Sequence, residues 1–217
     1  FHNSEGLIAC DYRPLVYISA ICVMEKEGRT ENFSVSRSAR KGSEFLSNDL
    51  VDTLAAEVVE KAKLQFLAGK PKAGEMEVVM SPGESGILLH EAIGHAFEAD
   101  FNRKKTSIFS DKLNKKVAED FITIVDDGTL PSDRGSLNFD DEGIPTENTR
   151  IVTNGVLTSY LHDRISAAHY NVKPTGNGRR QSFRFIPVPR MRSTRMENGP
   201  HKPEEIIASV KNGIYVT

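Results

Sequence analysis

The sequence has no apolar run long enough to cross a membrane, and its N-terminus lacks the basic and then apolar layout of a signal peptide. Only two of its 217 residues are cysteines, Cys10 and Cys22, which is the sparse usage that a reducing compartment allows. Its net charge of -2 gives no general attraction to nucleic acid or to an anionic membrane. We therefore expect neither nucleic acid nor a membrane as a partner.

The remaining composition is that of an ordinary globular protein, with 38% apolar and 27% charged residues. The length suffices for one large domain or two small ones. A short linker at residues 70–74 separates an N-terminal region, residues 1–74, from a C-terminal region, residues 75–217. The chain has no initiator methionine and ends in a strand-like run. We therefore expect an internal fragment that holds the end of an α/β region and the truncated start of the next region.

Strand and helix patterns together predict an α+β fold with mixed or antiparallel sheets and a few helices. The apolar, β-branched run 15–24 predicts a strand. Apolar residues at i, i+3 and i+4 spacing from Leu50 to Phe66 predict a helix. Asn154-Gly155 lies between two strand-like runs and predicts a two-residue hairpin. The final run, residues 213–217, reads as a strand without a partner.

A strand at residues 77–80 leads into a further helix. Ser81 is its expected N-cap, Pro82 occupies the first helical position, and Glu84 completes a capping box. Apolar side chains on several sides of this helix predict that it is largely buried and packs on a sheet.

This helix carries His90, Glu91 and His95. Two imidazoles that flank a carboxylate form the set that a zinc hydrolase uses, because the histidines hold the metal and the glutamate takes a proton from water. Without further information, the same residues are as compatible with a buried helix that carries two hydrogen-bonded histidines.

The pattern is HExxxH, one residue longer than the common zinc motif HExxH. On a regular α-helix, residues five positions apart point about 140° away from each other, so both imidazoles would not reach one ion. A π-type bulge, with its hydrogen bond from residue i+5 to residue i, would bring them to one face. Because Gly94 tolerates such a distortion, we predict an irregular turn between Ile93 and Ala96.

The stretch HEAIGHAFEADFNRK resembles the active-site segment of the TldD/PmbA family, in its TldD branch. The likeness continues through VDDGTLPSDRGSLNFDDEGIPTENTRIV and PTGNGRRQSF to PRMRSTRM, and it covers most of the chain from about Met76 onward. Several long motifs in the same order are far more specific than HExxxH alone. The resemblance implies a cytoplasmic zinc metallopeptidase that cleaves short or unstructured peptides, in leader-peptide maturation or in degradation.

The resemblance also implies partners. These are peptide substrates and a second subunit, so we expect a homodimer or a heterodimer with a PmbA/TldE-like paralogue that lacks the metal motif. In the family, the third zinc ligand is a cysteine close to the C-terminus, beyond residue 217, and neither Cys10 nor Cys22 matches that position. The chain then supplies two ligands of three, and we expect it to be inactive by itself.

Four other side chains within the chain remain open as the third ligand of a catalytic zinc, which normally has three protein ligands. They are Glu98, Asp100, His162 and His169. Glu98 lies about one helical turn after His95, and it is equally suited to accept a hydrogen bond from an imidazole N–H.

Asn177, Arg179 and Arg180 lie in a glycine-rich loop that lacks the spacing of nucleotide-binding motifs. We assign them to substrate binding, because arginine binds carboxylates well. The alternative is that the arginine pair supports the acidic loop 126–142. That loop has no EF-hand spacing, so its acidic residues are better explained by turns than by calcium.

The sequence therefore predicts a zinc-dependent metallopeptidase in which His90 and His95 hold Zn²⁺ and Glu91 is the catalytic base. The alternative is a non-catalytic partner or regulatory module of the same fold, as in the metal-free branch of the family. The intact triplet favours the peptidase, because a pure partner has no need for Glu91 between two histidines.

Overall fold

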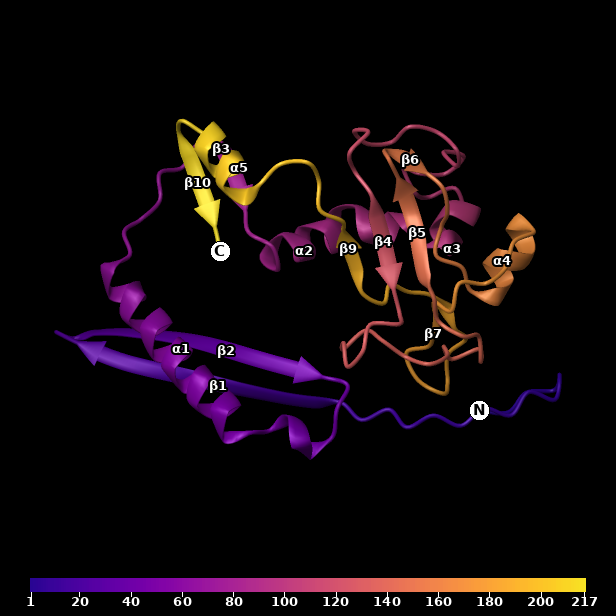
Figure 1. Cartoon of the computed structure of the whole chain (residues 1–217), viewed down its shortest axis with the longest axis horizontal. Coiled ribbons are helices and arrows are strands. Elements are labelled where there is room, and N and C mark those ends of the chain that lie inside the picture. Colours follow the sequence, from indigo (N-terminus) through magenta and orange to yellow (C-terminus); the bar gives the residue numbers. More distant parts are fainter. The chain divides into compact units, whose positions relative to one another are not determined.

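The computed structural model describes residues 1–217, apart from the side chain of Glu84, and it divides them into two compact units (Figure 1). The larger unit comprises residues 1–11, 76–131 and 135–217, and the smaller unit comprises residues 12–75 and 132–134. Residues 1–11 join the larger unit through an Arg164–Glu5 ion pair and a hydrogen bond from Asn138 to Asp11. The division into functional regions 1–74 and 75–217 stays a prediction.

The smaller unit is a long hairpin covered by a helix. β1 (Val16–Lys26) and β2 (Arg29–Ala39) are antiparallel, and α1 (Asn48–Leu67) packs on one face of them (Figure 1). The strand and the helix that the sequence predicts here are confirmed. The helix is capped by Ser47, whose side chain accepts from the N–H of Leu50 at 3.2 Å. Leu54 and Val58 are buried against Val35 of β2.

The larger unit is built on a four-stranded antiparallel sheet in the order β6-β5-β4-β9. Its strands are β4 (Ile124–Asp127), β5 (Asn148–Thr153), β6 (Val156–Leu157) and β9 (Thr194–Met196). The predicted hairpin is confirmed, with Asn154 and Gly155 both at positive φ, 49° and 78°, as its tight turn requires. Every residue of β4 is buried, so this strand forms the centre of the unit.

Three helices pack around the apolar core of this sheet: α2 (Glu84–Leu89), α3 (Ala99–Arg103) and α4 (Arg164–Tyr170). The helical stretch that begins with α2 brings Leu89, Ile93 and Phe97 to the core that contains Ile124 and Ile151, so its predicted packing on a sheet is confirmed. The expectation that it is largely buried is wrong. Ile87 is 63% and Leu88 55% exposed, because only one side of the stretch meets the core.

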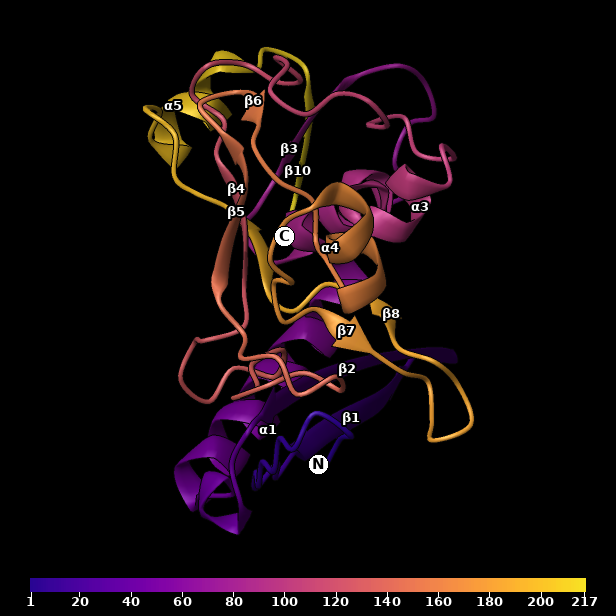
Figure 2. The same ribbon diagram turned by 90° about the vertical axis from the view of Figure 1, so that its right-hand side faces the viewer.

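Two smaller sheets complete the larger unit. β3 (Glu77–Met80) pairs in parallel with β10 (Gly213–Val216), and α5 (Pro203–Ser209) precedes β10. The expectation that the final strand has no partner is therefore wrong, because β3 supplies one. β7 (Gly178–Arg179) pairs with β8 (Val188–Pro189), and the loop between them extends away from both strands (Figure 2). With parallel and antiparallel pairs beside helices, the fold is α+β as predicted.

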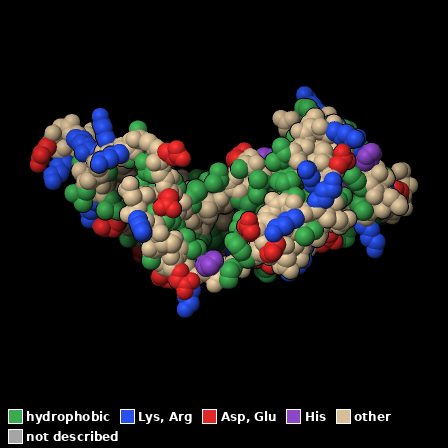
Figure 3. All heavy atoms as spheres, turned by 90° about the horizontal axis from the view of Figure 1, so that it is seen from above, with side chains coloured by type: hydrophobic (Ala, Val, Ile, Leu, Met, Phe, Trp, Pro, Cys, Tyr) green, Lys and Arg blue, Asp and Glu red, His purple; other side chains and the backbone are tan. Residues whose placement is uncertain are grey.

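Basic and acidic side chains are interspersed with apolar ones on the face shown in Figure 3. Across the described part of the chain, no helix is both long enough and apolar enough to span a membrane.

Candidate metal centre

The helix that carries the HExxxH motif begins later than the sequence predicts. α2 starts at Glu84, and its N-cap is Gly83, whose φ of 98° is left-handed. Ser81 is therefore not the cap, although its carbonyl accepts from the N–H of Ser85 at 3.2 Å. The prediction is wrong because the chain turns at Pro82-Gly83 before the helix starts, and glycine adopts that turn without strain. The sequence also predicts that the side chain of Glu84 completes a capping box, and this side chain lies outside the described residues.

The predicted irregular turn is present, and it begins at His90. Residues His90–Gly94 form a π-helical turn, and His95–Phe97 form a 3₁₀ turn directly after it. The N–H of His95 donates to the carbonyl of His90, which is a bond from residue i+5 to residue i. The wider turn brings the two histidines, five positions apart, onto one side of the helix.

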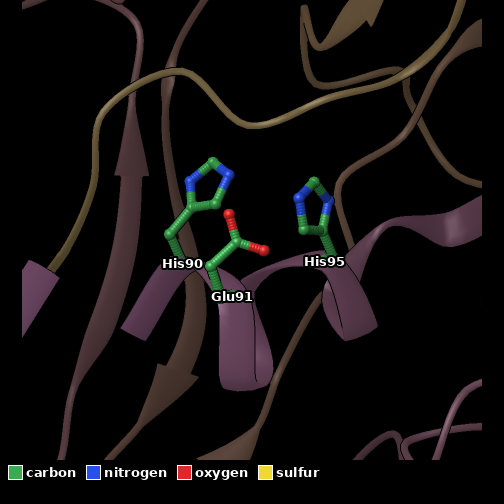
Figure 4. A group of neighbouring side chains, drawn as sticks. All are labelled: His90, Glu91 and His95. Atoms are coloured by element: carbon green, nitrogen blue, oxygen red, sulfur yellow. The ribbon is translucent and has the colours of Figure 1, made fainter. Parts of the chain in front are cut away.

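His90, Glu91 and His95 form a compact cluster. One potential ligand atom from each lies within 4.8 Å of the others, and the two imidazole rings are 4.7 Å apart and nearly perpendicular. The two rings rise from the same side of the helix, and the Glu91 carboxylate points into the space between them (Figure 4). Both histidines are half-buried and Glu91 is exposed. The group is therefore open to an ion and to a substrate.

The helix ends at Glu98, immediately after the cluster. The backbone of Glu98 is extended, with φ -67° and ψ 125°, and it forms a parallel bridge with Leu161. The amide of Asn102 donates to the carbonyls of Ala96 at 2.7 Å and Glu98 at 2.9 Å. These bonds hold the backbone at the end of the helix, and the Glu98 carbonyl also accepts from the N–H of Asn102 at 3.4 Å, because Glu98 is the N-cap of α3.

Glu98 is fully buried and holds His95. Its Oε1 lies 3.1 Å from Nδ1 of His95, and its Oε2 accepts from Nη1 of Arg190 at 2.9 Å. Burial raises the pKa of the Glu98 carboxyl, and the neighbouring charges of Arg190 and His95 act in the opposite direction. The sequence leaves two roles open for Glu98, as third zinc ligand or as a partner of an imidazole N–H. The structure shows the contact with the imidazole of His95.

The other third-ligand candidates lie apart from the cluster. Asp100 is buried on α3, 3.4 Å from the ammonium of Lys104, and His169 is exposed on α4. His162 is 3% exposed, and burial lowers its pKa to about 4. Within the described residues, none of these side chains belongs to the potential metal-binding group.

The predicted substrate residues of the glycine loop have different environments. Asn177 is 1% exposed, and its amide donates to Asp126 at 2.7 Å and to the carbonyl of Arg190 at 2.9 Å. Arg179 and Arg180 are exposed, and the backbone N–H of Arg180 donates to Asp141 at 3.0 Å. The geometry makes Asn177 part of the framework, and the substrate-binding role of the three residues stays a prediction.

Sequence reasoning missed Arg190, and its assignment of the acidic residues of 126–142 to turns is wrong for Asp126, which lies in β4. Asp126 is 1% exposed at the centre of the sheet, and it accepts from the backbone N–H of Arg192, from Thr194 and from Asn177. Burial raises the pKa of Asp126, and these hydrogen bonds act in the opposite direction. No spacing rule links Arg190 to Glu98, which lies 92 positions earlier in the sequence. Only the occurrence of Arg190 and Asp126 within the longer family motifs could have drawn attention to these two residues.

The donor set of the cluster fits zinc. Zinc binds imidazole nitrogen at about 2.0–2.1 Å in a tetrahedral arrangement, which places two such nitrogens about 3.4 Å apart. The limit of 4.8 Å on the separations in the cluster accommodates this distance. Imidazole also suits copper, iron and nickel.

Two family models match the chain. The PmbA/TldA metallopeptidase C-terminal domain matches residues 73–217, and the central domain of the same metallopeptidases matches residues 1–66. The chain belongs to the PmbA/TldD metallopeptidase family. Curated PmbA/TldD relatives include a metalloprotease TldD homolog of Buchnera aphidicola, 43% identical over 98% of this chain and 46% of its own length. A zinc metalloprotease TldD homolog of Saccharolobus solfataricus is 32% identical over 88% of this chain and 46% of its own length.

The fold also matches solved structures. The crystal structure of TldE from Thermococcus kodakarensis is similar with a TM-score of 0.74 over 93% of this chain and 45% of that chain, at 24% identity. At this identity the likeness shows the fold alone. The chain spans about half the length of the PmbA/TldD relatives it matches.

Gly94→Ala tests the packing that the π turn requires. A Cβ at Gly94 would lie 2.5 Å from Sδ of Met191 and 3.3 Å from the carbonyl of Leu89. We expect a loss of about 1–3 kcal/mol in the free energy of unfolding, measured by urea titration, because added atoms overpack a full site. The matched control is Gly86→Ala on α2, where a Cβ meets nothing within 4 Å and should stabilise the helix by about 0.5–1 kcal/mol. Equal effects of the two changes would contradict the packing.

Acidification tests the burial of His162. Its folded pKa of about 4 lies below the ordinary value of 6.5, so between these values the unfolded chain binds more protons than the folded one. The stability that neutral His162 contributes is therefore lost as the pH falls from about 6.5 to 4, by about 3 kcal/mol in all. The free energy of unfolding of wild type and His162→Phe should diverge by this amount over that range, and parallel pH curves would show that His162 is not buried as a neutral group.

Proposed function

We propose that the protein containing this chain is a zinc-dependent metallopeptidase that cleaves short or unstructured peptides, as in the maturation or degradation of a leader peptide. The observation that carries the proposal is the cluster of His90, Glu91 and His95 that the π turn assembles. The name of the Saccharolobus relative, a zinc metalloprotease, supports the choice of metal and reaction. A pure partner module of the same fold needs no such cluster.

His90 and His95 would hold the ion. When bound, zinc supplies the Lewis acid that polarises the scissile carbonyl and stabilises the negative charge developing on its oxygen. The third protein ligand is proposed to come from outside residues 1–217, which accords with the absence of Glu98, Asp100 and His162 from the potential metal-binding group of the described residues. Residues 1–217 alone are then expected to be inactive.

Glu91 acts as the general base and then as the general acid. Its carboxylate is exposed and directed between the two imidazoles, so it can accept a proton from the attacking water (Figure 4). The protonated carboxyl then passes this proton to the leaving amine when the peptide bond breaks. An exposed site at the end of an α-helix gives access to a chain without its own tertiary structure. Such access is compatible with the proposed short or unstructured peptides, and Arg179 and Arg180 remain candidates for binding substrate carboxylates.

Glu91→Gln in the full-length protein tests this function. We expect the zinc content to stay at the wild-type level, because both histidines remain, and kcat to fall by about 10²–10⁴-fold, the usual contribution of a general base. Metal analysis and cleavage of an unstructured peptide are the measurements. Glu60→Gln, the same change at an exposed position of α1, is the matched control and should cleave at the wild-type rate.

Two outcomes would contradict the proposal in different ways. If wild type holds zinc and Glu91→Gln cleaves as fast, the peptidase lacks the proposed base. If wild type neither holds zinc nor cleaves peptides, the helix is structural and the non-catalytic partner module is the better reading.

We further propose that the protein assembles as a dimer, with itself or with a TldE-like paralogue. The fold shared with TldE of Thermococcus kodakarensis is the observation behind this proposal, and two-fold symmetric dimers are the commonest assemblies of identical chains. Co-expression with such a paralogue should yield a complex whose mass is the sum of the two chains, or of two identical chains for a homodimer. A monomer in both experiments would contradict the pairing. The cytoplasmic location stays a prediction.

A further inference from the structure

The most constrained charged group near the cluster is Glu98. Its side chain is 0% exposed, and removing a carboxylate from water is costly unless both oxygens find partners. Each oxygen has one: Oε1 contacts Nδ1 of His95 at 3.1 Å, and Oε2 accepts from the guanidinium of Arg190 at 2.9 Å. The buried acid thus connects a candidate metal ligand to a cation from a distant part of the chain.

These contacts determine which nitrogen of His95 carries hydrogen. Burial raises the pKa of the Glu98 carboxyl, but the permanently protonated guanidinium of Arg190 donates to Oε2 at 2.9 Å and favours the ionised form. An ionised carboxylate only accepts hydrogen bonds, so the contact at Oε1 requires hydrogen on Nδ1 of His95. In a neutral imidazole, the lone pair is then on Nε2, the nitrogen left free for a metal.

The pair is built into the framework. The backbone of Glu98 is held at the end of the helix by the bonds from Asn102 to its carbonyl. Arg190 is held by two bonds to Asn177: its N–H donates to the Asn177 carbonyl at 2.9 Å, and its carbonyl accepts from the Asn177 amide at 2.9 Å. Asn177 is anchored in turn on buried Asp126. These bonds hold the backbone of Arg190 directly after β8, and its guanidinium also donates to the carbonyl of Pro189 at 2.8 Å.

We propose that Glu98, held by Arg190, is a positioning residue that fixes His95 with Nδ1 protonated and Nε2 presented to the metal. The inference rests on the proposed zinc site. Metal-binding histidines commonly donate their second N–H to a carboxylate, which sets the ring orientation and raises the basicity of the ligand nitrogen. A role for Glu98 as a ligand itself fits less well, because its oxygens are occupied and it lies outside the metal-binding group of the described residues.

Glu98→Gln in the full-length protein reverses the hydrogen bond. The amide oxygen will turn to the Arg190 guanidinium, since an NH₂ group there would face another donor. The amide NH₂ then donates to Nδ1 of His95, and the imidazole hydrogen moves to Nε2. We expect this tautomer in ¹⁵N NMR spectra of the metal-free variant and a 10–100-fold loss of zinc affinity by chelator competition, the usual effect of removing such a partner. Glu119→Gln, an exposed matched control, should retain the wild-type tautomer and affinity.

Arg190 provides a second test if Glu98→Gln fails to fold. Arg190→Gln removes the cation that holds the carboxylate and should lower zinc affinity by about tenfold. Arg190→Lys should restore most of it, because only one guanidinium nitrogen contacts Glu98 and an ammonium replaces that donor. If Arg190 had a purely structural role, restoring its positive charge in Arg190→Lys would not be expected to restore the zinc affinity.

The outcomes separate this inference from the proposed function. Hydrogen on Nε2 of His95 in metal-free wild type, or a zinc affinity of Glu98→Gln within twofold of wild type, would overturn the positioning role and leave the peptidase proposal standing. A wild-type protein that binds no zinc would overturn both. Loss of affinity with the changed tautomer in Glu98→Gln, and neither in Glu119→Gln, would support the inference.

Discussion

The candidate site depends on one backbone hydrogen bond, from the N–H of His95 to the carbonyl of His90. This bond defines the π turn, and without it the two imidazoles would point about 140° apart. Gly94, which has no side chain, leaves the space beneath the turn in which Met191 packs. A local change of helix geometry and the packing beneath it therefore determine together that two histidines five positions apart face one point.

The imidazole of His95 is also oriented by groups far away in the sequence. A continuous set of polar contacts, buried at Asp126 and Asn177 and partly buried beyond them, runs from Asp126 through Asn177 and Arg190 to Glu98 and then His95. Buried polar groups stabilise a single arrangement only when each has its partners, and a lost partner leaves a costly unpaired group. We interpret this set as the means by which the central strand of the sheet supports the site. The framework role of Asn177 follows from the same contacts.

The family relationship and the side-chain cluster support different conclusions. Membership of the PmbA/TldD metallopeptidases follows from family models that together match residues 1–66 and 73–217. The shared fold with TldE shows only the architecture, because one fold can carry different functions. The proposed hydrolysis depends on His90, Glu91 and His95, whose side chains have the chemistry that metal-assisted cleavage needs.

The sequence by itself determined the features that depend on neighbouring residues. The 3.6-residue periodicity from Leu50 to Phe66, the Asn154-Gly155 turn and the need for a bulge within HExxxH are all local, so pattern and spacing suffice to predict them. Helix starts were less predictable, because the strain-free turn at Gly83 overrides the capping pattern at Ser81. Only the tertiary structure decided that β3 pairs with β10 and that Arg190 meets Glu98. These contacts join residues 136 and 92 positions apart, and they are selected by the packing of the whole unit, which no local pattern encodes.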